Sequence, residues 1–211
     1  MNERDSEIIA QLLAHEGYVT TYTPEDADLI LINTCSIREK AEQKVFSLLG
    51  SLRAEKAKKP SMLLGVTGCV AQQEGEQIRT RMPHVDLIVG TQQIYRLPEM
   101  IDRLQLGMTR QEIATDMEAS FTIPPFQKLL ATAPPSPVTH GFKRFVTIMQ
   151  GCDNFCAYCV VPLVRGRERS RRPVEVLAGV SGIGKRIKTF ADIEFNSGTV
   201  SFFGIERYVI V

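Results

Sequence analysis

The sequence predicts an α/β fold built around a parallel sheet, and three observations carry this prediction. Short apolar runs alternate with amphipathic segments through the first hundred residues, as in folds where strands and helices are wound alternately. Of the 211 residues, 44% are hydrophobic and 23% are charged, so the chain can bury a core. No apolar run approaches the roughly 20 residues that a membrane helix needs. We therefore expect a globular protein that is not attached to a membrane.

Each predicted element follows from its local pattern. Asp5 and Ser6 can cap the first helix, whose apolar side chains recur on one face. Ser36 and Glu39 form a capping box, in which each side chain satisfies a free backbone amide at the start of a helix. The strand segments are mostly continuous apolar runs, the pattern of strands buried on both faces. In chain order we expect helix 5–15, strand 18–22, strand 28–33, a helix from residue 36 to just before Pro60, strand 62–66, helix 72–81, strand 86–89 and helix 94–104.

The chain divides into four segments by composition and periodicity. Periodicity fades after the last predicted helix, where five prolines indicate a linker. A strand predicted at 142–149 then leads into a cysteine-rich loop, and two short strands are expected near the end of the chain, at 200–203 and 208–211. In order, the segments are an α/β domain 1–104, a linker 105–140, the start of a second domain 141–175 and a tail 176–211.

Charge is distributed unevenly along the chain, although the formal net charge is only +1. Residues 1–100 carry a net charge of −3 and residues 141–211 a net charge of +5. Five arginines lie within eight residues of the basic segment, and guanidinium groups suit the oxygens of phosphates. We expect this cluster to contact an RNA backbone, and a solvated basic loop is the alternative. The five residues are Arg165, Arg167, Arg169, Arg171 and Arg172.

The strongest chemical signal is the run Cys152-Asp-Asn-Phe-Cys156-Ala-Tyr-Cys159. Three thiols on one short loop can converge on a single metal centre, and thiolates favour zinc, copper(I) or iron–sulfur clusters. A closed zinc site needs four ligands, and His140 is the nearest candidate for the fourth. Three ligands on an iron–sulfur cluster leave one iron open to a substrate, which suits catalysis. The odd total of five cysteines argues against a secreted disulfide framework, so we expect a reducing, cytoplasmic location.

The other two cysteines, Cys35 and Cys69, share a position in the predicted fold. Each one follows a buried parallel strand and precedes a helix. The carboxyl edge of an open α/β sheet is where ligands bind, and helix N-termini at this edge stabilise thiolate charge. Two buried apolar cysteines without a ligand are the alternative interpretation.

These motifs resemble the methylthiotransferase family of the radical S-adenosylmethionine superfamily. The spacing CxxxCxxC, with Tyr158 just before the last cysteine, is similar to the cluster-binding signature of that superfamily. The stretch Asn-Thr-Cys-Ser-Ile-Arg-Glu-Lys around Cys35 resembles the branch of the family that acts on tRNA. The resemblance covers about residues 1–175. The stretches that carry it are 33–47, 65–73, 86–90 and 160–170.

The resemblance implies a fold, a reaction and cofactors. It implies a methylthiotransferase α/β domain followed by the start of a partial (β/α) barrel. Cys152, Cys156 and Cys159 would bind a [4Fe–4S] cluster whose open iron holds S-adenosylmethionine, and Cys35 and Cys69 match two of the three ligands of an auxiliary [4Fe–4S] cluster. The implied reaction is methylthiolation of N6-isopentenyladenosine in tRNA at C2 of the adenine. An electron donor, a sulfur source and a monomeric state are implied as well.

The sequence departs from the family pattern at both ends. The family's first auxiliary cysteine lies in an opening strand that precedes the residues matched here, and the tail 176–211 does not resemble the rest of a barrel. We therefore expect a chain truncated at both ends, with the first strand missing from its sheet, and an inactive fragment. The alternative functions are a methylthiotransferase acting on a ribosomal protein and a non-catalytic iron–sulfur or RNA-binding module. A GxxxxGK match at 179–185 is a weak nucleotide-binding signal, because Arg186 replaces the Ser or Thr that a phosphate loop needs.

Overall fold

A four-stranded parallel sheet forms the centre of the molecule, which confirms the predicted α/β class. The computed structural model describes residues 2–21, 23–36, 39–118, 121–124, 145–154, 156–184 and 206–210. The parallel strands are β2 (Leu29–Thr34), β3 (Leu63–Gly68), β4 (Leu87–Val89) and β5 (Glu112–Ala114), paired in that order. The whole sheet has the order β1-β8-β2-β3-β4-β5. The carboxyl ends of the four parallel strands therefore meet at one edge.

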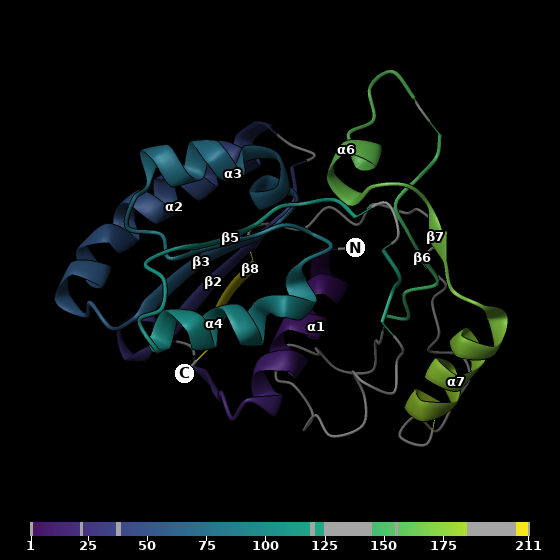
Figure 1. Cartoon of the computed structure of the whole chain (residues 1–211), viewed down its shortest axis with the longest axis horizontal. Coiled ribbons are helices and arrows are strands. Elements are labelled where there is room, and N and C mark those ends of the chain that lie inside the picture. The colour runs from purple at the N-terminus through teal and green to yellow at the C-terminus, as the bar shows by residue number, and fades with distance from the viewer. Residues whose placement is uncertain are drawn as a thin grey trace.

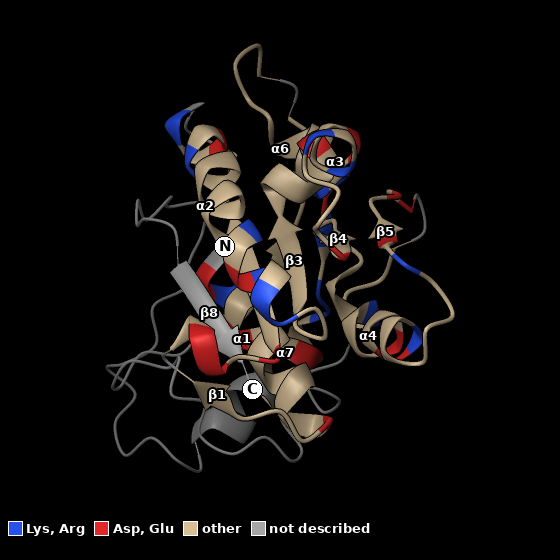
Figure 2. Ribbon diagram, turned by 90° about the vertical axis from the view of Figure 1, so that its left-hand side faces the viewer, with Lys and Arg blue, Asp and Glu red and all other residues tan. Residues whose placement is uncertain are grey.

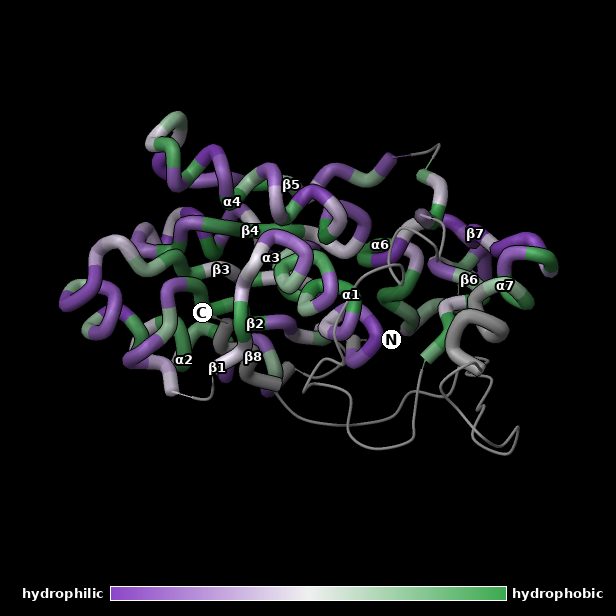
Figure 3. The backbone as a smooth tube through the Cα atoms, turned by 90° about the horizontal axis from the view of Figure 1, so that it is seen from below, coloured by the Kyte–Doolittle hydropathy of each residue, from purple (hydrophilic) through white to green (hydrophobic). Residues whose placement is uncertain are grey.

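Helices cover both faces of the sheet, because side chains along each strand alternate between the faces (Figure 1). Ile30 and Ile32 pack in the core beneath α2 (Glu39–Lys58) and α3 (Cys69–Arg81). Leu29 and Leu31 pack in a second core with α1 (Asn2–His15) and α4 (Leu97–Gln105). Figure 3 shows the strands as mostly hydrophobic tube between helices of alternating hydropathy, and in Figure 2 the strand β3 carries no charged residue. The continuous apolar runs predicted for buried strands are thus confirmed.

The predicted elements of the first hundred residues are present with shifted ends. The strand predicted at 18–22 is reduced to β1 (Thr20–Thr21), and the helix predicted at 72–81 begins three residues earlier, at Cys69. Two short 3-10 helices complete this part, η1 (Pro24–Asp26) and η2 (Ile94–Arg96), the second leading into α4. The second predicted helix begins at Glu39, and residues 37–38 of its expected start lie outside the described residues.

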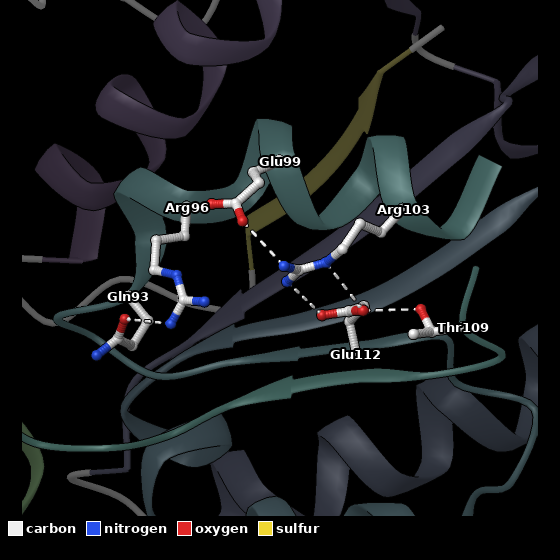
Figure 4. Close-up of polar contacts among 6 residues, drawn as sticks. All are labelled: Gln93, Arg96, Glu99, Arg103, Thr109 and Glu112. Atoms are coloured by element: carbon white, nitrogen blue, oxygen red, sulfur yellow. Dashed lines mark hydrogen bonds and ion pairs between the residues drawn. The ribbon is translucent and has the colours of Figure 1, made fainter. Parts of the chain in front are cut away.

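The sheet extends into the segment that the sequence predicts as a linker. β5 pairs with β4 from Leu87↔Glu112 to Val89↔Ala114, so the α/β unit continues beyond residue 104. The run Glu-Ile-Ala is too short to show the alternation of side chains that identifies a strand, so the sequence predicts a linker there. An ion pair attaches this edge strand to α4: the Arg103 guanidinium holds the Glu112 carboxylate with Nη2–Oε2 and Nε–Oε1 separations of 2.7 and 3.2 Å (Figure 4).

The position beside β2 is taken by β8 (Glu206–Ile210), which agrees in part with the strand predicted at 208–211. β8 runs antiparallel to β2, from Leu29↔Ile210 to Asn33↔Glu206, and pairs on its other side with β1. The edge of β2 that the sequence analysis expected to lack a partner is therefore covered by backbone hydrogen bonds. The other strand predicted for the tail, at 200–203, lies outside the described residues.

The part that follows residue 144 is a small ribbon with two helices. β6 (Met149–Gln150) pairs with β7 (Arg169–Ser170). In the chain, α6 (Val161–Arg165) lies between these two strands and α7 (Pro173–Gly184) follows β7. The described residues show no barrel. Of the strand predicted at 142–149, residues 142–144 lie outside the described residues, and within the rest only Met149 belongs to a strand, β6. Residues 179–184 of the GxxxxGK match form the end of α7 and not the loop that precedes the helix of a phosphate loop. Among the described residues, no helix combines the length and hydrophobicity needed to cross a bilayer.

Gly65 is required where three strands meet. In β3 it pairs with Leu31 on one side and with Leu87 on the other. A Cβ at this position would lie 2.6 Å from the Leu31 Cδ2 and 3.0 Å from the Leu87 Cβ. We predict that Gly65→Ala lowers the free energy of unfolding by about 1–3 kcal/mol through overpacking, measured by urea denaturation. Gly50→Ala is the control, because Gly50 lies in α2 with open space around its Cα, and it is expected to stabilise the helix.

The Arg103–Glu112 pair predicts a pH dependence of stability. Burial alone would raise the pKa of Glu112, but hydrogen bonds from Thr109 and Arg103 and the charge of Arg103 lower this pKa below 4.5 overall. A lowered folded-state pKa stabilises the protein above the unfolded-state value, and this contribution is lost as the pH falls through the folded-state pKa. Glu112→Gln is therefore expected to lower the urea midpoint at neutral pH, with the difference from wild type narrowing under acid conditions.

Glu76→Gln is the control for Glu112→Gln, because the Glu76 side chain is 76% exposed and lies 3.7 Å from its partner Arg79. It is expected to leave the urea midpoint nearly unchanged at both pH values. A difference between wild type and Glu112→Gln that stays constant from neutral to acid pH would contradict the assignment of this carboxylate.

Candidate functional site

Cys35 and Cys69 lie side by side at the carboxyl edge of the sheet. The last registered pair between β2 and β3 is Thr34↔Gly68, and the two cysteines are the next residue on each strand. Their side chains are within hydrogen-bonding reach of each other. Cys69 is 3% exposed, whereas Cys35 is half-buried. The sequence analysis expected both cysteines at this edge, and the structure brings them into contact.

Gly68 makes the turn that places Cys69 at the start of α3. Its φ of 89° lies in the left-handed region that side chains rarely adopt, and the strand passes directly into the helix there. Cys69 therefore lies at the helix N-terminus, where the free backbone amides favour negative charge on a nearby sulfur.

A buried ion pair adjoins the two cysteines. Arg165, the last residue of α6, is 3% exposed, and its Nη2 lies 2.5 Å from the Oδ2 of Asp5 in α1. Arg165 also donates a hydrogen bond to Cys69. Three elements that are distant in sequence, α1, α3 and α6, thus meet at one point through charged or polar side chains. Sequence reasoning considered Asp5 only as a helix cap, and no local pattern indicates a pairing across 160 residues.

The cluster favours a thiolate at Cys69. The hydrogen bond with Cys35 lowers the pKa of Cys69, burial opposes this effect, and the charge of Arg165 lowers it further, to about 6 overall. For Arg165, burial would lower the pKa, but the negative charges of Asp5 and Cys69 raise it above its usual range. Arg165 therefore stays charged, and its charge favours the ionised form of Cys69.

Hydroxyl groups beside the two cysteines have unused hydrogen-bonding capacity. The side-chain oxygens of Thr34, Ser36 and Thr67 are shielded from solvent and have no hydrogen-bond partner within the described part of the chain. Thr34 and Ser36 flank Cys35, and Thr67 lies two residues before Cys69. Buried polar groups in folded proteins are nearly always satisfied, so these hydroxyls favour a polar group bound at this edge.

The loop 152–159 carries three free thiols near the surface. Cys156 is exposed, and Cys152 and Cys159 are half-buried. At the start of the loop, the backbone amide of Cys152 donates to the carbonyl of Gly166 at 3.1 Å. At its end, the backbone amide of Cys159 donates to the carbonyl of Cys156 within the loop at 3.0 Å. Within the described residues, no three His, Cys, Asp or Glu side chains are gathered closely enough to hold a metal ion. The three thiols therefore share one loop but do not converge in this structure.

The helix α6 connects this loop to the buried cysteine pair. The carbonyl of Val164 accepts a 2.5 Å hydrogen bond from the Thr91 hydroxyl at the end of β4, and the next residue is the buried Arg165. Five residues lie between Cys159 and Arg165. The two cysteine sets that the sequence analysis singled out are thus linked by one short helix that packs on α3.

The predicted arginine cluster is divided by the fold. Arg165 and Arg171 are buried, and Arg171 donates to the carbonyls of Thr147 and Pro124, so neither is available to an RNA backbone. Arg167 remains at the surface in an ion pair with Asp153, and Arg172 in one with Glu175. Arg169 is half-buried in the short strand β7. Which of the five arginines are buried depends on what packs against them, so the sequence alone does not predict it.

The buried ion pair predicts a double-mutant signature. Arg165→Met leaves the Asp5 carboxylate buried without its partner, and we predict a loss of about 3–5 kcal/mol in the free energy of unfolding. Combining it with Asp5→Leu is expected to restore much of this loss, because neither charge then remains buried. Thermal and urea unfolding of the single and double variants measure the coupling. Arg172→Met, which removes an exposed pair, is the matched control and is expected to change little. Additive losses in the double variant would contradict the predicted coupling.

Comparison with known proteins supplies the relatives of this chain. Residues 1–90 match the family described as "Uncharacterized protein family UPF0004". The chain is 50% identical over 192 residues to "tRNA-2-methylthio-N(6)-dimethylallyladenosine synthase" of Desulfotalea psychrophila, covering 88% of this chain and 40% of that relative. It is 43% identical over 219 residues to the protein of the same name from Geobacter sulfurreducens, covering 99% of this chain and 47% of that relative.

These matches cover nearly the whole chain but only part of each relative. A third relative of the same name, from Acinetobacter baumannii, is 46% identical over 189 residues, which is 88% of this chain and 38% of the relative. The chain thus spans less than half the length of the curated relatives named here, and the alignment that covers 99% of it extends into the tail 176–211. Residues 1–90 therefore match the UPF0004 family model, and the chain is similar along most of its length to proteins named tRNA-2-methylthio-N(6)-dimethylallyladenosine synthase.

Proposed function

We propose that this chain provides the UPF0004 domain and the cluster-binding loop of an enzyme that methylthiolates tRNA. The substrate is N6-isopentenyladenosine in tRNA, modified at C2 of the adenine. Sequence similarity to synthases of that name along 88–99% of the chain supports this proposal. We further propose that the enzyme is cytoplasmic and monomeric and takes an electron donor and a sulfur source as partners.

The observation that carries the proposal is the linkage of two cysteine sets within one folded unit. One set lies on the loop 152–159, and the other is the buried pair Cys35 and Cys69. The chain between them passes through α6, whose Arg165 contacts Cys69. A reaction that both activates a substrate and delivers sulfur to it needs two such centres within reach of each other.

The donor sets fit iron–sulfur clusters by their chemistry. Thiolates are the ligands that hold these clusters, and Cys152, Cys156 and Cys159 supply three of them from one loop. In the proposal they hold a [4Fe–4S] cluster together with S-adenosylmethionine, and Cys35 and Cys69 provide two ligands of an auxiliary [4Fe–4S] cluster. When bound, the first cluster supplies the electron that cleaves S-adenosylmethionine, and the protein supplies binding, orientation and electrostatics.

The chain's own residues would prepare both sites. Asp153 accepts a hydrogen bond from the backbone amide of Glu168, and this contact holds the start of the loop next to the residue that precedes β7. At the second site, Arg165 keeps positive charge beside Cys69 in a place shielded from water. A guanidinium in that position favours the thiolate that a metal ligand must become.

The exposed arginines are proposed to contact the phosphates of the tRNA. The side chains of Arg167 and Arg172 are 73% and 78% exposed, which leaves both available at the surface together with the half-buried Arg169. Their ion pairs with Asp153 and Glu175 are exposed and therefore weak enough to exchange for phosphate contacts. Binding through these groups would fall with rising salt concentration.

Anaerobic reconstitution with ferrous iron and sulfide tests the cluster assignment. The full chain is expected to take up about one [4Fe–4S] cluster on the loop, visible in its absorbance and by iron analysis. The triple variant Cys152→Ala/Cys156→Ala/Cys159→Ala is expected to lose this cluster, while Cys35→Ala/Cys69→Ala retains it. Equal iron binding by the triple variant and the wild type would overturn the assignment.

A second readout separates the enzyme from a non-catalytic iron–sulfur or RNA-binding module. The reconstituted chain is incubated with S-adenosylmethionine, dithionite and tRNA that contains N6-isopentenyladenosine. Release of 5′-deoxyadenosine and methylthiolation of the tRNA support a catalytic chain, whereas retention of the tRNA without release of deoxyadenosine supports the inactive fragment or the binding module. Replacing the tRNA by a ribosomal protein tests the alternative substrate class.

A further inference from the structure

The buried cysteine pair has chemistry of its own besides metal binding. We propose that Cys35 and Cys69 close a reversible intramolecular disulfide under oxidising conditions. The disulfide goes beyond the proposed function and forms in the chain without any metal. Four observations support this disulfide: the backbone geometry, the contact between the sulfurs, the difference in accessibility of the sulfurs and the groups around the two cysteines.

The backbone brings the two residues together at one edge of the sheet. They follow the last registered pair of two adjacent parallel strands, Thr34↔Gly68. Neighbouring strands lie about 4.8 Å apart at such a pair, and Cys35 and Cys69 are the residues that come directly after it. A side-chain hydrogen bond joins the two cysteines, so their sulfurs lie close together. Closure brings the sulfurs from hydrogen-bonding distance to the length of an S–S bond, about 2.05 Å.

The accessibility of the sulfurs sets the order of the exchange. Cys35 is half-buried and reachable from solvent, whereas Cys69 is 3% exposed. With glutathione disulfide as the oxidant, the Cys35 sulfur attacks one sulfur of the oxidant and releases one glutathione thiolate. The Cys69 sulfur then attacks the Cys35 sulfur, which breaks the mixed disulfide and releases the second glutathione thiolate.

The exchange is balanced in atoms and electrons. Two cysteine thiols and one glutathione disulfide become one protein disulfide and two molecules of glutathione, so the protein loses two electrons and two protons. Glutathione itself cannot reach the buried sulfur of Cys69, so the mixed disulfide forms on Cys35 and is resolved from the inside. A reducing glutathione pool reverses the reaction by the same steps.

The surroundings distinguish this pair from the other thiols. Cys69 is buried at the start of α3 next to Cys35, whereas Cys156 lies on an exposed loop. Closure would withdraw both buried thiols from metal binding. This last consequence, unlike the disulfide itself, rests on the proposed function.

The test uses the full chain with Cys152→Ser/Cys156→Ser/Cys159→Ser, which leaves Cys35 and Cys69 as its two cysteines. The exposed position of the loop makes these changes compatible with folding, and circular dichroism verifies it. The variant is equilibrated in buffers of increasing oxidised-to-reduced glutathione ratio, alkylated, digested with trypsin and analysed by mass spectrometry. Formation of the disulfide joins peptide 5–38 to peptide 59–79 with the loss of two hydrogen atoms.

The same variant unfolded in urea is the matched control, since it has identical thiols without the fold. We expect the folded chain to reach half-oxidation at a glutathione ratio about tenfold or more below that of the unfolded chain, because the fold raises the effective concentration of one thiol at the other. No linked peptide in the folded chain, or the same ratio for folded and unfolded chains, would overturn the proposal. The measurement contains no iron, so its outcome is independent of the cluster reconstitution.

Discussion

The parallel pairing of β2 with β3 is the constraint on which the candidate site depends. Six registered residue pairs hold the two strands together, and both strands end at the same level, at Thr34 and Gly68. Because parallel strands end at the same edge, the residues that follow them are neighbours even though 34 positions separate them in sequence. The apolar side chains of these strands pack against α2 and α3 on one face of the sheet and against α1 and α4 on the other face. The position of the two sulfurs is therefore a result of core packing.

The buried ion pair between Arg165 and Asp5 links the second part of the chain to this edge. A charged pair removed from water gains little net stability, because the loss of hydration offsets most of the attraction. Its main effect is to fix one arrangement, since separating the pair would leave a charge uncompensated in the interior. The arrangement it fixes has functional meaning, because α6 begins two residues after Cys159 and ends beside Cys69. The loop 152–159 and the buried cysteine pair are thus held in a defined relation.

The two cysteine sets differ in the physical state of their thiols. The loop 152–159 lies near the surface, its thiols are separated, and its local contacts are backbone hydrogen bonds and the exposed Asp153–Arg167 pair. Such a loop can adjust its thiols around an incoming group at low cost. The pair Cys35 and Cys69 is already in contact, is largely buried and lies among hydroxyls without hydrogen-bond partners in the described residues. The thiols of the loop are therefore open to solvent, whereas the thiols of the pair are enclosed by the core.

The sequence by itself determined the α/β class and the main elements, and it singled out the cysteines of the candidate site. Apolar runs and helical periodicity are local signals. The spacing of Cys152, Cys156 and Cys159 likewise predicts that the three residues share one loop, without any tertiary information. The tertiary structure decided the rest. It added Glu112–Ala114 to the sheet, because a three-residue strand is identified by its partner and not by its own pattern. It buried Arg165 against Asp5 while Arg167 stayed at the surface, since burial depends on what packs against a residue and not on its charge. It also placed Cys35 in contact with Cys69, because which strands become neighbours is settled by the packing of the whole core.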